Sequence, residues 1–178
     1  MKKLHFIPVI FIVFLSCTGN DKQTPAASSA NSVKTEKHVY WEIGPDSNVN
    51  KIAELYRLWD EKKTFAATDY FADTFNLNTP EAKKERVVPN DQISTALGEA
   101  RNSYNATSNA IISSVSLRDK VTGEDWVMVT AYSKWTEKDG TKDSVLYHED
   151  WRLKNGKINL LLSFYKIPPK GFSIKKDK

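Results

Sequence analysis

Residues 147–164 read Tyr-His-Glu-Asp-Trp-Arg-Leu-Lys-Asn-Gly-Lys-Ile-Asn-Leu-Leu-Leu-Ser-Phe, two runs of strand-forming residues on either side of Asn155-Gly156. Asparagine and glycine both tolerate a positive φ, so this pair predicts a two-residue type I′ hairpin turn. In an uninterrupted hairpin, the turn places Glu149 opposite Leu162. One face of the hairpin is then apolar apart from Glu149, with Tyr147, Trp151 and Leu153 against Ile158, Leu160, Leu162 and Phe164.

Upstream of the hairpin, the pattern of apolar residues predicts three helices. The first segment with apolar residues at helical spacing is 49–59, which follows three candidate capping residues at 46–48. The second is 64–71, with Thr64 as its cap, and the third is 90–104, which follows Pro89. From Ala110 the period changes to two, with turn residues at 122–123, 139–140 and 155–156. Three helices followed by a four-stranded antiparallel meander indicate an α+β fold with the helices packed on one sheet face.

The turn at Asp139-Gly140 decides which residues of the preceding strand share a face with Glu149, and the sequence allows two lengths. A two-residue turn places Trp126, Thr130 and Tyr132 beside Glu149, whereas a three-residue bulged turn moves that strand to the opposite face. In the two-residue register the outward face carries an apolar patch, which usually marks an interface. This patch predicts a homodimer and consists of Val127, Val129, Ala131, Trp135, Leu146, Leu161 and Tyr165.

The first sixteen residues read as a targeting segment, with Lys2 and Lys3 before a twelve-residue apolar run. This run is too short to span a hydrocarbon core of about 30 Å. It ends in Phe14-Leu-Ser-Cys17, which resembles a bacterial lipobox, where the peptidase cuts before the cysteine and the sulfur carries a diacylglyceryl group. An ordinary secretory signal with an incidental cysteine is the alternative. Cys17 is the only cysteine, so no internal disulfide forms.

Residues 17–37 are rich in Ser, Ala, Thr, Asn and Lys and predict a disordered tether of roughly 25 Å average reach. Residues 38–178 suit one domain with its own core. We therefore expect a bacterial lipoprotein displayed on the periplasmic or cell-surface side of a membrane. Removing Lys2 and Lys3 leaves 24 basic and 22 acidic residues, too small an excess to predict nucleic-acid binding.

Three motifs resemble the nuclear transport factor 2-like superfamily, and its SnoaL-like and ketosteroid-isomerase-like branches most closely. They are Trp59-Asp-Glu-Lys-Lys63, Phe71-Ala-Asp73 and the strand pair from Glu149 to Ile158, within a similarity that covers roughly residues 48–166. The resemblance implies a cone-shaped fold in which a curved sheet wraps against helices and leaves an apolar pocket. The superfamily includes isomerases, cyclases, dehydratases, ligand binders and structural dimerisers, so the fold does not assign an activity.

The resemblance to the isomerases is partial at their catalytic positions. Their oxyanion-hole aspartic acid corresponds to a position near Glu149, and their catalytic base to a position near Asn78 or Thr79, neither of which is a carboxylate. Their oxyanion tyrosine corresponds to a position near Leu55, one residue from Tyr56. These departures argue against steroid-type isomerisation.

Glu149 is the main candidate for chemistry, because a carboxyl group among apolar side chains has a raised pKa. It could anchor a ligand or act as a general acid or base, and the plainer alternative is a structural glutamate bonded to a neighbour. The predicted ligand-binding residues are Glu149, Trp151, Tyr147, Tyr132, Thr130, Trp126 and Tyr56. His148 and Asp150 share the opposite face without a third ligand, so the sequence predicts no metal site, and no cofactor motif is present.

These observations favour a lipid-anchored, non-catalytic domain that binds a small apolar or amphipathic molecule or acts as a dimerising module. The alternative is a SnoaL-like isomerase, cyclase or dehydratase that uses Glu149, with Tyr132 or Tyr147 as a hydrogen-bond donor. A third reading is a structural subunit whose pocket is filled by its own side chains. An open pocket of several hundred Å³ separates the first two from the third.

Overall fold

The computed structural model describes residues 40–79 and 84–174. The expected signal peptide of residues 1–16, the lipidated Cys17 and the tether of 17–37 lie outside these ranges. The described residues belong to one compact unit, His38–Lys178. Its elements are β1 (Trp41–Ile43), α1 (Asp46–Asp60), α2 (Ala67–Tyr70), β2 (Phe71–Asn78), β3 (Arg86–Pro89), α3 (Asn90–Asn102), β4 (Tyr104–Asp119), β5 (Asp125–Glu137), β6 (Lys142–Lys154) and β7 (Lys157–Lys166).

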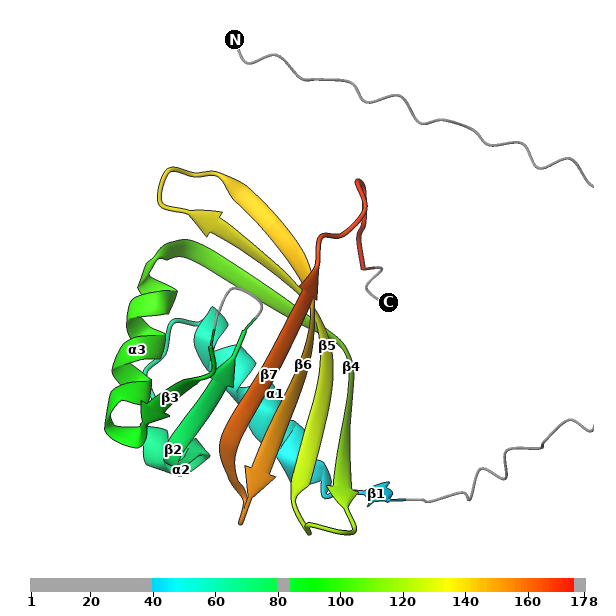
Figure 1. Ribbon diagram of the computed structural model, residues 1–178. Coiled ribbons are helices and arrows are strands. Elements are labelled where there is room, and N and C mark those ends of the chain that lie inside the picture. The colour runs from blue at the N-terminus through cyan, green and yellow to red at the C-terminus, as the bar shows by residue number, and fades with distance from the viewer. Residues whose placement is uncertain (1–39, 80–83, 175–178) are drawn as a thin grey trace, which may run out of the picture. The chain divides into compact units, whose positions relative to one another are not determined.

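All seven strands form one curved, open sheet with the order β1-β4-β5-β6-β7-β2-β3 (Figure 1). Strands β4 to β7 make the expected antiparallel meander, and β4 begins at Tyr104 instead of Ala110. The sheet is mixed, however, because β2 pairs with β7 in parallel. The α+β class is confirmed, and the purely antiparallel sheet is corrected.

Two of the expected helices are substantial and the third is a single turn. Helix α1 packs across the concave face of the sheet, and α3 lies beside β2 and β3 (Figure 1). The segment predicted as a helix over 64–71 forms only the four-residue α2, because Phe71 already begins β2. Phe65 and Phe71 stack there with ring centroids 6.2 Å apart, so aromatic packing directs this segment. No helix within the described residues is long and apolar enough to cross a membrane.

The β6–β7 hairpin has the predicted turn, followed by a bulge that the sequence analysis did not include. Asn155 and Gly156 have φ angles of 52° and 72°, as a type I′ turn requires. The pair Leu153–Ile158 is in register, but the next pair is Arg152–Leu160, so Asn159 is the extra residue. Glu149 is therefore opposite Ser163, and the prediction that Leu162 faces it is wrong.

The β5–β6 connection follows the second alternative, a three-residue loop. The amide of Glu137 bonds to the carbonyl of Thr141 at 2.8 Å, and Gly140 between them has a φ of 87°. Val129 consequently pairs with Glu149, and β5 presents its other set of side chains to the helices. The prediction that Trp126, Thr130 and Tyr132 share the face of Glu149 is wrong for this reason.

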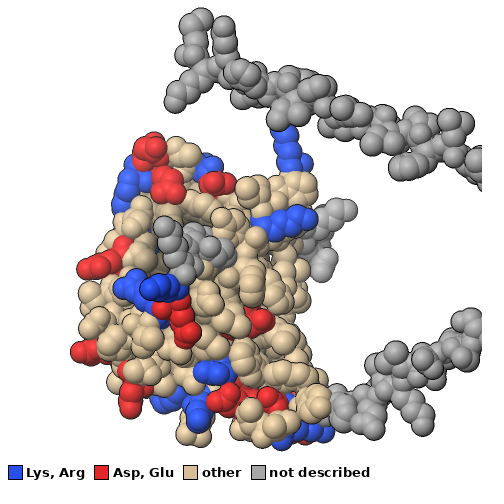
Figure 2. Space-filling view, in the orientation of Figure 1, with Lys and Arg blue, Asp and Glu red and all other residues tan. Residues whose placement is uncertain are grey.

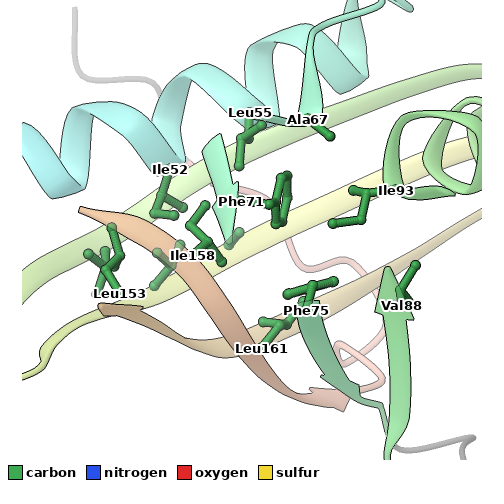
Figure 3. Packing of buried hydrophobic residues seen from close by; sticks show 13 residues of the cluster. Ile52, Leu55, Ala67, Phe71, Phe75, Val88, Ile93, Leu153, Ile158 and Leu161 are labelled. Atoms are coloured by element: carbon green, nitrogen blue, oxygen red, sulfur yellow. The ribbon is translucent and has the colours of Figure 1, made fainter. Parts of the chain in front are cut away.

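The core lies between α1 and the concave sheet face and includes much of the surface expected to be exposed. Ile52 and Leu55 of α1 point toward Phe71 and Ile158 (Figure 3). The predicted outer patch is therefore corrected: four of its members belong to the buried core, Val127, Val129, Ala131 and Leu161. Two others, Trp135 and Tyr165, line a cavity on the inner side, and Leu146 alone keeps the outward position.

Candidate functional site

A cavity of about 800 Å³ opens between the helices and the concave face of the sheet. That volume is within the range of small-molecule sites, roughly 300–1,000 Å³. Most of its lining surface is apolar, and the apolar or aromatic residues that contribute are Leu55, Tyr56, Leu58, Trp59, Phe65, Phe71, Leu97, Tyr104, Trp135, Val145, Tyr147, Trp151, Leu161, Tyr165 and Ile167. The cavity is not filled by the described side chains, which argues against the reading of a purely structural subunit.

Three elements bring a polar cluster to the wall of this cavity. Strand β6 supplies Glu149, helix α1 supplies Tyr56, and β7 supplies Ser163. The Tyr56 hydroxyl donates to Oε2 of Glu149 in a short hydrogen bond, and Ser163 Oγ donates to Oε1 at 3.3 Å. Tyr56 can reach the strand because it follows the core residue Leu55 and so lies on the flank of the helix that faces the cavity.

Burial sets the protonation of this cluster. Removal from water raises the pKa of the Glu149 carboxyl, while the hydrogen bonds from Tyr56 and Ser163 act in the opposite direction. Burial, and then the charge of Glu149, raise the pKa of the Tyr56 phenol. The site therefore favours a neutral phenol beside a carboxyl group that keeps its proton to a higher pH than an exposed glutamate. Such a pair can donate hydrogen bonds to a carbonyl or transfer a proton to it.

The indole of Trp151 adds a third polar group beside the carboxyl. Its presence also lowers the pKa of Glu149, so its N–H dipole favours the charged form. The same indole also lowers the pKa of the Tyr56 phenol, so its N–H is directed at the hydrogen-bonded pair of Tyr56 and Glu149.

A second polar cluster fastens the end of α1 to the wall of the cavity. The carboxylate of Asp60 accepts from Thr107 Oγ1 at 3.0 Å and from the Nδ2 and backbone amide of Asn109 at 2.6 and 2.8 Å. Ser133 in turn donates to the side-chain oxygen of Asn109. Both carboxylate oxygens of Asp60 thus accept from β4, and we assign this cluster to positioning α1 over the sheet.

Four of the seven predicted ligand-binding residues line the cavity: Tyr56, Tyr147, Glu149 and Trp151. The other three lie on the opposite face of the sheet. Trp126 packs edge-on against Trp41, and Thr130 lies beside His148. Tyr132 is buried under Phe172 with ring centroids 5.0 Å apart, and its hydroxyl donates to Ser144.

The positions that correspond to the isomerase residues have diverged in the structure as well. Asn78 ends β2, and neither it nor Thr79 lines the cavity, so no carboxylate base occupies that place. The tyrosine displaced by one position, Tyr56, nevertheless meets Glu149. Among the described residues, no group of three His, Cys, Asp or Glu side chains is arranged to hold a metal ion.

Sequence reasoning missed two polar residues of the site, Ser163 beside Glu149 and Arg101 in the lining of the cavity. Ser163 was overlooked because the bulge at Asn159 changes the register of β7. Arg101 was overlooked although Ile93, Leu97 and Arg101 follow one another at intervals of four, which puts a charged residue on the apolar stripe of α3. Arg101 is buried, with 6% of its surface exposed, and it lines the cavity.

Solved structures with similar folds come from the nuclear transport factor 2-like and SnoaL-like proteins. A candidate SnoaL-like polyketide cyclase from Jannaschia sp. CCS1 aligns with a TM-score of 0.55 and 12% identity over 70% of this chain and 90% of its own. A nuclear transport factor 2-like protein of unknown function from Burkholderia pseudomallei K96243 gives 0.54 and 13%, over 67% and 90%.

The epoxide hydrolase/cyclase-like enzyme SalBIII, which has a role in pyran ring formation in the polyether salinomycin, gives a TM-score of 0.53 and 18% identity over 68% of this chain and 92% of its own. No family model and no curated protein matches the sequence. At these identities the similarity shows the fold alone: the chain has a nuclear transport factor 2-like, SnoaL-like fold.

Proposed function

We propose that this chain, whose fold is nuclear transport factor 2-like, binds a small apolar or amphipathic molecule in its cavity. The observation that carries the proposal is an open, largely apolar cavity of about 800 Å³ whose wall holds Glu149, an acid bonded to Tyr56. Apolar lining supplies affinity, and a few polar groups fix the orientation of a ligand. A carbonyl or hydroxyl group of the ligand would accept from the protonated carboxyl of Glu149.

Gly98 offers a direct test, because it lies on α3 and lines the cavity, and an added Cβ would meet no atom within 4 Å. Gly98→Leu should fill part of the cavity and weaken binding of the apolar fluorescent probe phenylnaphthylamine at least tenfold. Gly98→Ala is the matched control and should keep the binding. Both substitutions should stabilise α3 by about 0.5–1 kcal/mol, since glycine is a poor helix former. Equal probe affinity in both variants would place the probe outside the cavity and contradict the proposal.

A second candidate function, proton-transfer catalysis of the isomerase, cyclase or dehydratase kind, is favoured by one observation. The raised pKa of Glu149, together with the phenol bonded to it, is what a general acid requires. Native mass spectrometry of the protein purified from its own cells would identify the molecule that copurifies. Incubated with that molecule in heavy water, an enzyme should introduce deuterium, and Glu149→Gln should bind it without exchange. No exchange by the wild type would leave the chain a binder.

We also propose that the domain is displayed at a bacterial membrane surface through a lipid on Cys17, on the periplasmic or cell-surface side. The support comes from the sequence, in which the only cysteine ends the apolar run of the leader. A homodimer through the outer sheet face remains a proposal, with different residues from those first expected. Val115 and Phe164 lie on that face and are 38% and 57% exposed. These two exposed apolar side chains are the basis of the dimer proposal.

A further inference from the structure

Arg101 carries a buried positive charge in the wall of the cavity. Among the described residues its guanidinium donates only to backbone carbonyls, to Trp59 O at 2.7 Å, to Tyr104 O at 3.2 Å and to Asp60 O at 3.4 Å. Two of these carbonyls belong to the last residues of α1, whose partial negative charge offsets part of the cost of burial. A cap on α1 is therefore one role of Arg101.

In the part of the chain that the structure describes, the charge of Arg101 has no ionic partner. Within residues 40–79 and 84–174, none of the ion pairs includes Arg101. The carboxylate of Asp60, its neighbour at the end of α1, is occupied by Thr107 and Asn109. A buried charge without a counter-charge is costly, and such groups are normally paired. An anion in the cavity would supply the missing partner.

Lys62 places a second cation at the rim of the same cavity. It follows α1 in a left-handed conformation, with a φ of 55°, which is unfavourable for a residue other than glycine. Its side chain is exposed and makes no ion pair in the described part of the chain, whereas the neighbouring Lys63 is paired with Glu61 at 2.7 Å. A flexible lysine at this position can reach a ligand without breaking an existing bond.

The balance of charges around the cavity also favours a negatively charged ligand. The cavity lining contains the cations Lys62, Lys63, Arg101 and Lys134 and the acids Asp143 and Glu149. The outer surface in view shows acidic and basic side chains interspersed and no large patch of either sign (Figure 2). Of these cations Arg101 is buried and the three lysines are exposed, and an excess of cations around a cleft raises the positive potential and attracts an anion.

We propose that the ligand of the cavity is an organic anion, an apolar body with one carboxylate or similar group, and that Arg101 and Lys62 bind the anionic end. This proposal rests on the proposed ligand-binding function and specifies the class of ligand. Arg101 provides the buried contact because guanidinium matches a carboxylate in geometry and charge. Lys62 provides a mobile contact at the rim, and the apolar body lies against the aromatic lining.

Two fluorescent probes that differ by one anionic group test this inference. Anilinonaphthalenesulfonate is phenylnaphthylamine with a sulfonate added, so the ratio of their dissociation constants isolates the anionic contribution. We expect the wild type to bind the sulfonate at least tenfold more tightly than the neutral probe, about 1.4 kcal/mol. Arg101→Gln should remove most of that preference, and Lys62→Gln should reduce it severalfold, while the affinity for the neutral probe is unchanged. Lys120→Gln, on an exposed residue that does not line the cavity, is the control.

The outcomes separate this inference from the proposed function. If both probes bind with equal affinity, the anion proposal is wrong and the binding function stands; if neither binds, the proposed function is wrong and the inference falls with it. A loss of affinity for both probes in Arg101→Gln would assign Arg101 to capping α1 alone and overturn its role in recognition. Should Arg101→Gln not fold, the comparison of Lys62→Gln with Lys120→Gln decides: an equal sulfonate preference in those two variants overturns the proposal.

Discussion

Replacing Glu149 by glutamine tests the protonation of the site, because glutamine has the shape of the neutral acid and does not titrate. In the folded chain, burial raises the pKa of Glu149. In the unfolded chain the group has the ordinary value of about 4.3. Below that value both states carry the proton, so the acid contributes its full stability to the fold. As the pH rises through the folded pKa, the unfolded state ionises first and this stability is lost.

The size of the effect follows from linkage. Each unit by which the folded pKa exceeds the unfolded one lowers the free energy of unfolding of the wild type by about 1.4 kcal/mol at pH values above both. Glu149→Gln escapes this loss, so its stability relative to the wild type should rise between pH 4 and pH 8 and then level off. At pH 4 the two proteins should differ by no more than about 1 kcal/mol, since the glutamine oxygen can still accept from Tyr56.

Urea unfolding at a series of pH values measures this difference, and the side-chain carboxyl shift of Glu149 in NMR gives its midpoint directly. Glu61→Gln is a matched control of opposite sign. Hydrogen bonds to Lys63 and Arg57 lower the pKa of this exposed carboxylate, so its contribution is lost as the pH falls. A relative stability of Glu149→Gln that stays constant or falls toward pH 8, or a midpoint at or below that of an exposed glutamate, would refute the argument for a neutral acid.

The other predictions concern the neighbours, the hairpin, the anchor and the outer face. Tyr56→Phe leaves Oε2 of Glu149 without its donor and should cost about 1–3 kcal/mol in urea unfolding, more at pH 8 than at pH 4; an equal cost at both would argue against a titrating partner. Gly156→Ala meets no atom within 4 Å but strains a φ of 72°, so a loss of about 1–2 kcal/mol is expected, and no loss would contradict the turn assignment. Cys17→Ser should abolish metabolic labelling with a radioactive fatty acid, and continued labelling would rule out the anchor. Phe164→Lys should give a folded monomer in sedimentation, and a wild type that is itself monomeric at tens of micromolar would disprove the dimer.

Several elements of the fold could be predicted from the preferences of residues that lie close together in the sequence. The turn at Asn155-Gly156 was predictable because only a few residues adopt positive φ without strain. The apolar stripes of α1 and α3 were predictable because residues at helical spacing share one face, which packs on the core. Each of these helices ends within two residues of its predicted C-terminal limit. The inward face of β6, with Glu149 among aromatic residues, followed from alternation alone.

The register of the neighbouring strands depended on the rest of the fold. Ile158 and Leu161 are three residues apart, which puts them on opposite faces of a regular strand, yet both are buried at 0% and 8% exposure. The bulge at Asn159 resolves this conflict and brings Ser163 to Glu149. In β5 both faces are apolar, so alternation could not choose between them. The three-residue turn selects the inward face, and it directs the small side chains of Val127, Val129 and Ala131 toward the core.

The sequence by itself determined the α+β class, the hairpin, the two long helices and an acid on the inward face of β6, because each rests on preferences of residues close together in the chain. Only the tertiary structure decided that Tyr56 meets Glu149 across 93 positions, that Arg101 lines the same cavity, and that β2 joins β7 in parallel. Such contacts depend on how the helices lie across a curved sheet. That arrangement is selected by the burial of the whole core, a sum over many weak contacts that no single stretch of sequence contains.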